Sequence, residues 1–176
     1  MPPSTPAARI SSRVPCRDVE NVALEAWGRD VVERAATLIF AEVPAVQLPE
    51  IGPPSKARSG SGYVSRHVHF RHPGYPVQRS VWLFVVSAEH RYNIGSLRPR
   101  AGAGLMQDAD TELSELRSVA GLLRSGAFTW RRHNDDRYQG YRLVVDVDPD
   151  VDAPEARAEE LAAAVLHGLR RASLIP

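Results

Sequence analysis

The sequence has few of the residues on which several kinds of protein site depend. Its 176 residues include one cysteine, Cys16, so neither a disulfide within the chain nor a cysteine-based zinc site can form. Its one lysine, Lys56, has no acidic residue two positions before it, which excludes the nuclease signature that ends in acid-x-Lys. The other basic residues are arginines, whose planar guanidinium groups suit phosphate and carboxylate.

Long apolar runs are also absent. No run approaches the ~20 residues of a membrane-spanning helix, and the N-terminus has no apolar stretch typical of a secretory signal. We therefore expect a cytoplasmic protein that does not contact a membrane. The length and the hydrophobic content of 43% fit one domain with a single core. We expect residues 1–17 to form a flexible arm and residues 18–176 to form one domain.

Charge is distributed unevenly along a chain whose net charge is only +1. Residues 56–100 carry eight basic residues against one acid, and residues 143–176 carry seven acids against three arginines. The protein is therefore internally polarised, with a basic middle and an acidic end. The basic middle is the first place to expect a binding surface.

The periodicity of apolar residues predicts an α+β fold. Helices are predicted over 18–42, 109–125 and 153–172, the last beginning at a capping box formed by Asp152 and Glu155. Strands are predicted over 63–72, 80–88, 91–98, 128–132 and 138–148, and a long irregular connection over 43–62. The order α-βββ-α-ββ-α favours an antiparallel sheet of about five strands with three helices on one face.

The strand predicted over 63–72 alternates between two faces. One face carries apolar residues together with Arg66, and the other carries Tyr63, Ser65, His67, His69 and Arg71. If the helices cover the apolar face, a ligand would lie on the other. The glycines of Gly60-Ser61-Gly62, just before this strand, allow a close approach to phosphate, but a P-loop would lead into a helix.

His67 and His69 are the candidate residues for chemistry, because imidazole titrates near neutral pH and binds metals. A metal site needs at least three ligands, and no acid lies between His69 and Glu89, so we predict no metal and no other cofactor. No G-x-S-x-G motif marks a nucleophile. We therefore assign no catalytic residue; if the protein is an enzyme, His67 and His69 would serve a small hydrolase or lyase.

Arginine and aromatic residues are interleaved over 63–100 and again over 130–142. Guanidinium groups neutralise phosphate and exposed rings stack on bases, so the mixture is typical of a single-strand platform. The candidate binding residues are Tyr63, Arg66, His67, His69, Arg71, Tyr75, Arg79, Arg91, Arg98, Arg100, Arg131 and Arg132. The main hypothesis is a non-catalytic accessory protein that binds nucleic acid through this surface. The alternative is an adaptor that docks on an acidic protein, with a homo-oligomer or a larger complex left open.

The piece FTWRR…YRLVVDV…EELAAAVLHGLRRA, within about the last 70 residues, resembles uncharacterised α+β modules attached to predicted nuclease and restriction-associated proteins. The chain matches no catalytic motif of those proteins, so the resemblance assigns no residue. It favours a function related to nucleic acid.

Overall fold

The computed structural model describes the backbone of residues 16–71, 78–93, 96–108, 124–125, 128–129, 131–134 and 138–176. The helical elements are α1 (Cys16–Glu42), a short 3-10 helix η1 (Ala45–Gln47) and α3 (Pro154–Arg171). The strands are β1 (Glu50–Ile51), β2 (Tyr63–Arg71), β3 (Gln78–Val86), β4 (Arg100–Asp108), β5 (Arg124–Ser125), β6 (Phe128–Thr129), β7 (Arg131–Asn134) and β8 (Tyr138–Asp146). In the part of the chain that is described, no helix is both long and apolar enough to span a bilayer.

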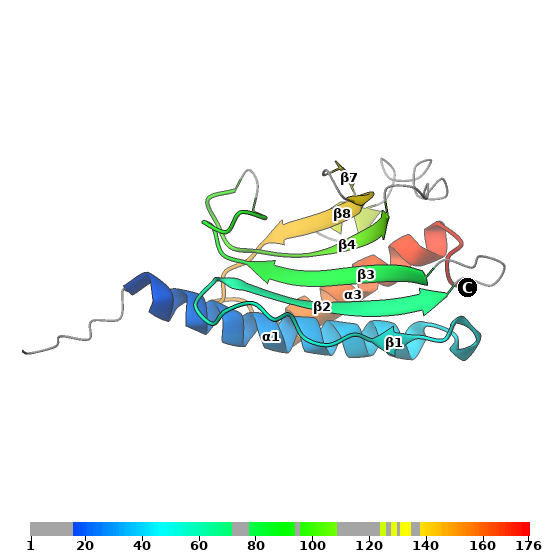
Figure 1. The fold of residues 1–176 in the computed structure, drawn as a ribbon, viewed down its shortest axis with the longest axis horizontal. Coiled ribbons are helices and arrows are strands. Elements are labelled where there is room, and N and C mark those ends of the chain that lie inside the picture. Colours follow the sequence, from blue (N-terminus) through cyan, green and yellow to red (C-terminus); the bar gives the residue numbers. More distant parts are fainter. Residues whose placement is uncertain are drawn as a thin grey trace, which may run out of the picture.

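The fold is α+β, as predicted, with an antiparallel sheet in the order β1-β2-β3-β4-β8-β7 and a separate β5-β6 pair. Both α-helices contribute to one core against the sheet, and α3 runs behind β2 and β3 in Figure 1. A hairpin is present as β7 and β8, but its first strand is Arg131–Asn134 rather than the predicted 128–132, and Phe128–Thr129 form β6 in the separate pair. Two α-helices are described rather than three: residues 109–123 of the predicted middle helix lie outside the described residues, and its predicted end, Arg124–Ser125, forms strand β5.

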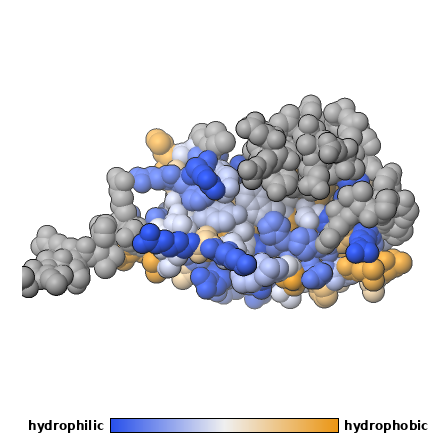
Figure 2. Space-filling model, in the orientation of Figure 1, coloured by the Kyte–Doolittle hydropathy of each residue, from blue (hydrophilic) through white to orange (hydrophobic). Residues whose placement is uncertain are grey.

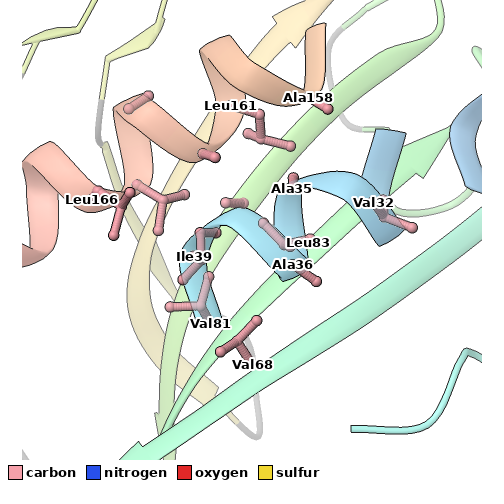
Figure 3. Packing of buried hydrophobic residues seen from close by; sticks show 14 of the residues in the cluster. Val32, Ala35, Ala36, Ile39, Val68, Val81, Leu83, Ala158, Leu161 and Leu166 are labelled. Carbon is pink, nitrogen blue, oxygen red and sulfur yellow. The ribbon is translucent and has the colours of Figure 1, made fainter. Parts of the chain in front are cut away.

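The core lies between the two helices and one face of the sheet. Apolar residues of α1 recur at spacings of three and four, which places them in one buried stripe: Leu24, Trp27, Val31, Ala35 and Ile39. Figure 3 shows Ala35 and Ile39 of this stripe in the core with Leu161 of α3 and the strand residues Val68, Val81 and Leu83. The helix predicted over 18–42 is therefore confirmed, although it begins at Cys16, inside the arm predicted over 1–17.

The strand predicted over 91–98 is wrong. Residues 88–92 form turns, and the third long strand is β4, whose sequence RAGAGLMQD is rich in alanine and glycine. Asn93 holds the connection by donating hydrogen bonds from Nδ2 to the carbonyl oxygens of Ser87 (2.9 Å) and Arg98 (2.8 Å). β4 becomes a strand because both of its neighbours, β3 and β8, pair with it.

The connection predicted over 43–62 contains η1 and β1 and is otherwise irregular. Its middle part follows the edge of β2. Glu50 and Ile51 pair with that strand, and two further hydrogen bonds run from the Gly52 N–H to the His67 carbonyl (2.9 Å) and from the Ser55 N–H to the Ser65 carbonyl (3.1 Å). Residues 50–55 thus extend the sheet beyond the two residues of β1.

The end of this connection is bound by Glu25 of α1, which is 5% exposed. Its carboxylate accepts hydrogen bonds from the N–H groups of Gly60 (3.0 Å) and Gly62 (2.8 Å) and from the Ser61 hydroxyl (3.3 Å). The N–H groups of Gly60 and Gly62, which a phosphate would need, therefore already bind the protein's own anion, and the Ser61 N–H donates to the Arg58 carbonyl (3.1 Å).

The capping box predicted at the start of α3 is absent. The N-cap is Ala153, with no side-chain hydrogen bond, although Pro154 occupies the first turn as expected. The carboxylate of Asp152 instead accepts the backbone N–H of Asp148 (2.9 Å) and pairs with Arg157 (3.1 Å). Asp152 therefore orders the turn before the helix rather than the helix end itself.

Candidate functional site

We call the face of the sheet turned away from α1 and α3 the outer face. On β2, Val64, Val68 and Phe70 are buried against the helices, and the alternate residues belong to the outer face. The strand register continues these positions across the sheet: Ser65 stands opposite Phe84, and Phe84 opposite Gly102. The two faces predicted for β2 are therefore confirmed.

Five rings gather at one end of the outer face, and we call them the aromatic cluster: Tyr63, Trp82, Phe84, His90 and Tyr92. The Tyr63 ring stacks on His90 with centres 5.0 Å apart, and the Trp82 and Phe84 rings are 4.5 Å apart. Tyr92 closes the group at 5.1 Å from His90 and 6.1 Å from Trp82. Phe84 is fully buried, whereas the other four residues keep part of their surface exposed.

The Tyr63 hydroxyl lies at the centre of the polar contacts in the cluster. It accepts a hydrogen bond of 3.0 Å from the indole N–H of Trp82. Burial raises the pKa of Tyr63 above its ordinary value, against the opposing effect of hydrogen bonds with Ser65 and Trp82. The hydroxyl therefore remains protonated at neutral pH.

Arginines border the aromatic cluster on two sides. The Arg142 guanidinium of β8 lies 4.5 Å from the centre of the Phe84 ring and donates a hydrogen bond of 2.9 Å to the Tyr92 carbonyl. Arg91 lies 4.8 Å from the centre of the Tyr92 ring and donates to the Tyr92 hydroxyl at 3.0 Å. The cluster therefore presents cationic groups directly beside partly exposed rings.

Further along β2 the outer face carries the histidine pair, His67 and His69. Their ring centres are 5.7 Å apart and their planes differ by 18°. The Nδ1 of His69 lies 2.6 Å from the Ser80 hydroxyl oxygen, and a Cβ on Gly52 would lie 2.9 Å from His69 Nε2. Ser80 and Gly52 thus fix the orientation of the His69 ring.

Burial, together with the charge of His69, lowers the pKa of His67 below its ordinary value of 6.5. The unfolded chain therefore binds this proton more readily than the folded protein does. The stability associated with neutral His67 is fully present above pH 6.5 and is lost as the pH falls toward the folded pKa. Burial shifts the pKa of His90 in the same direction.

We accordingly expect the free energy of unfolding to decrease between about pH 7.5 and pH 5, and to decrease less in His67→Gln. Urea unfolding followed by tryptophan fluorescence at several pH values measures this. His167→Gln, at an exposed position of α3, is the control and should keep the wild-type decrease. An unchanged pH dependence in His67→Gln would contradict the prediction.

Two predicted binding residues do not reach the outer face. Arg66 faces the helices, where its Nε pairs with Glu33 of α1 at 2.9 Å and its Nη1 donates to the Gly52 carbonyl at 2.8 Å. Arg79 also lies on the helix-facing side of its strand and is only 1% exposed. The sequence reasoning was wrong here because it treated arginines in a basic segment as surface groups.

The other predicted binding residues differ in where they lie. Arg71, Arg91 and Arg98 are exposed, and Arg100 pairs through Nε with Asp146 at 2.9 Å, a contact that lowers the pKa of that carboxyl. Only the backbone of Arg131 and Arg132 is described, in β7, and Tyr75 lies outside the described residues. Tyr63, His67 and His69 share the outer face, as predicted.

The candidate binding residues chosen from the sequence omit most of the aromatic cluster and its arginine, namely Trp82, Phe84, His90, Tyr92 and Arg142, although all five lie in the arginine- and aromatic-rich segments 63–100 and 130–142. Trp82 and Phe84 lie in a strand that is apolar on both faces, so nothing in that segment distinguishes them from core residues. Cross-strand pairing of His67 with Trp82 supplies the missing signal, but the register is needed to use it.

Two other findings bear on ligand binding, one about a pocket and one about metal ions. A pocket of about 410 Å³ between the start of α1 and the turn after β3 is lined by Glu20, Asn21, Ala23, Leu24, Ser87, Ala88, Glu89, Pro99, Pro149 and Asp150. Its three carboxylates make it unsuited to a phosphate group. Among the described residues, no group of three histidine, cysteine or acidic side chains is placed to hold a metal ion.

Comparison with known proteins adds no relative. No family model matches the chain, and no match was found among the curated proteins or the solved structures. Function is therefore argued from the geometry of the outer face.

Proposed function

We propose that the outer face binds single-stranded nucleic acid, with the aromatic cluster stacking on bases and the neighbouring arginines contacting phosphates. The observation that carries this proposal is the cluster itself. Tyr63, Trp82, His90 and Tyr92 come from two strands and a turn, yet each residue keeps part of its surface exposed. Partly exposed rings on a sheet offer stacking surfaces that accept any base.

The placement of charge supports the same ligand. Arg91 and Arg98 are exposed in the segment between β3 and β4, and Arg71 is exposed at the opposite end of β2. The nine residues of β2 span roughly 26 Å, which accommodates several nucleotides of an extended strand. Figure 2, viewed with α3 behind the sheet, shows mainly hydrophilic residues on the described surface, with an apolar patch at the turn after α1, where Val46 and Leu48 are exposed.

Fluorescence anisotropy with labelled single-stranded oligonucleotides tests the proposal. We expect Tyr92→Ala to weaken binding by about 5- to 150-fold, because one stacked base contributes about 1–3 kcal/mol. Phe40→Ala is a matched control: Phe40 is 40% exposed on α1 and Tyr92 is 38% exposed. We expect the control to bind as the wild type does.

The salt dependence of the same binding reports on phosphate contacts. Between about 50 and 300 mM salt, Arg91→Ala should reduce the slope of log affinity by about one relative to wild type, whereas Arg171→Ala, at the end of α3, should not. Absence of binding at about 50 mM salt contradicts the proposal and leaves docking to an acidic protein as the hypothesis to test. An equal loss in Phe40→Ala and Tyr92→Ala would also contradict it.

A further inference from the structure

Beyond the aromatic cluster, the outer face of β2 continues with three groups suited to phosphate chemistry. His67, His69 and Arg71 occupy alternate positions, so all three lie on the outer face in a line. His67 is the cross-strand partner of Trp82, which places the histidine pair directly beside the stacking surface. A strand whose base stacked on Trp82 would therefore carry its sugar and phosphate past the two imidazoles.

The spacing of the imidazoles fits one reacting phosphate. Their centres are 5.7 Å apart, and a ring nitrogen reaches an oxygen at about 3 Å, so two oxygens of one phosphate can contact both rings. The His69 ring is also held in place: its Nδ1 lies 2.6 Å from the Ser80 hydroxyl oxygen, and a Cβ on Gly52 would lie only 2.9 Å from its Nε2. Arg71 is exposed two residues further on, where a guanidinium can contact the same phosphate.

We propose that the outer face cleaves the single-stranded RNA that it binds, by acid–base catalysis from His67 and His69 and without a metal ion. This inference rests on the proposed function and narrows its ligand to RNA. His67 accepts the proton of a ribose 2′-hydroxyl while that oxygen forms a bond to the adjacent phosphorus. The bond from phosphorus to the 5′ oxygen of the next nucleotide breaks, and His69 donates a proton to the departing oxygen.

The products of this step are a 2′,3′-cyclic phosphate and a free 5′-hydroxyl, and the reaction consumes no other reactant. One proton enters at His67 and one leaves from His69, and exchange with water restores both rings. The assignment of His67 as the base follows from its environment, since burial lowers its pKa and keeps it neutral. Arg71 stabilises the charge that develops on the phosphate oxygens. DNA has no 2′-hydroxyl and cannot react in this way.

The test uses the full chain with a labelled oligoribonucleotide in the presence of EDTA. Denaturing gels follow cleavage, and mass spectrometry identifies the product ends. We expect 2′,3′-cyclic phosphate ends and a rate that falls by about 10²- to 10⁴-fold in His67→Ala and in His69→Ala. His167→Ala, an exposed histidine of α3, should cleave at the wild-type rate. A DNA strand of the same sequence should bind and stay intact.

The outcomes separate this inference from the proposed function. RNA that binds but stays intact overturns cleavage and leaves binding in place, whereas failure of both RNA and DNA to bind overturns both. Cleavage that persists in a His67→Ala/His69→Ala double variant, or that yields ends other than a cyclic phosphate, also overturns the inference. If an alanine variant fails to fold, two tests remain. One is His67→Gln, and the other is an RNA with a single 2′-O-methyl group, which must resist cleavage at that bond.

Discussion

Replacing Gly102 by valine is expected to destabilise the fold by about 3 kcal/mol or more. A Cβ at this position would lie 2.4 Å from the carbonyl oxygen of Leu143 on β8 and 2.6 Å from Cζ of Phe84. The carbonyl belongs to the backbone of the neighbouring central strand, so it cannot move aside without breaking the pairing of β4 with β8. Urea unfolding monitored by circular dichroism measures the change.

Leu97→Val is the control for Gly102→Val. Leu97 is 97% exposed in the segment just before β4, so its substitution should change the free energy of unfolding by less than about 0.5 kcal/mol. A Gly102→Val protein as stable as this control would show that β4 tolerates a side chain there. Gly102→Ala adds the same Cβ and should also displace the Phe84 ring, over which the Arg142 guanidinium lies. The position therefore links the stability of the sheet to the shape of the aromatic cluster.

Replacing Glu25 by alanine is expected to cost about 3 kcal/mol, because three donors lose a charged acceptor at once. The N–H groups of Gly60 and Gly62 and the Ser61 hydroxyl would then have to find water. Gly62 has a φ of 69°, so the turn depends on glycine and on the contact that holds it there. Amide exchange at Gly62 should accelerate in parallel with the loss of stability.

Glu42→Ala is the matched control on the same helix. The Glu42 carboxylate makes an exposed ion pair of 2.8 Å with Arg170, and such pairs contribute at most about 1 kcal/mol. If Glu25→Ala were no more destabilising than Glu42→Ala, the loop would be held by something other than the carboxylate. The comparison separates a buried anchor from a surface pair, since both substitutions remove the same functional group.

The elements with a strong pattern could be predicted from the sequence. α1 and α3 have a clear helical stripe, and β2 alternates so regularly that both of its faces were assigned correctly. β4 could not be recognised, because alanine and glycine have low strand propensity and the segment becomes a strand only through its two neighbours. Residues 91–98 gave the opposite error. Their alternation of polar and apolar residues predicts a strand, but the chain turns here and Asn93 holds the turn through its hydrogen bonds.

The candidate site was only partly predictable, because it is assembled across the sheet. The part on one strand, Tyr63 with His67 and His69, follows from alternation alone. Trp82 and Arg142 join it only through the register of four strands. The errors at Arg66 and Arg79 have a common cause, because both guanidinium groups were assumed to lie at the surface. Arg66 instead pairs with Glu33 on the helix-facing side of the sheet, and Arg79 is only 1% exposed.

The pairing of residues 50–55 along β2 has a consequence for self-association. A long, flat strand at the edge of a sheet can pair with the same strand of another molecule and start an aggregate. Here the carbonyl groups of Ser65 and His67 already bind residues 50–55, so this part of the edge is not available to a second chain. If that segment detached, the unpaired N–H and C=O groups of β2 would be exposed at the edge of the sheet. We expect that edge to pair with other molecules and to start aggregation. The irregular connection after α1 thus protects the strand that carries Tyr63, His67 and His69.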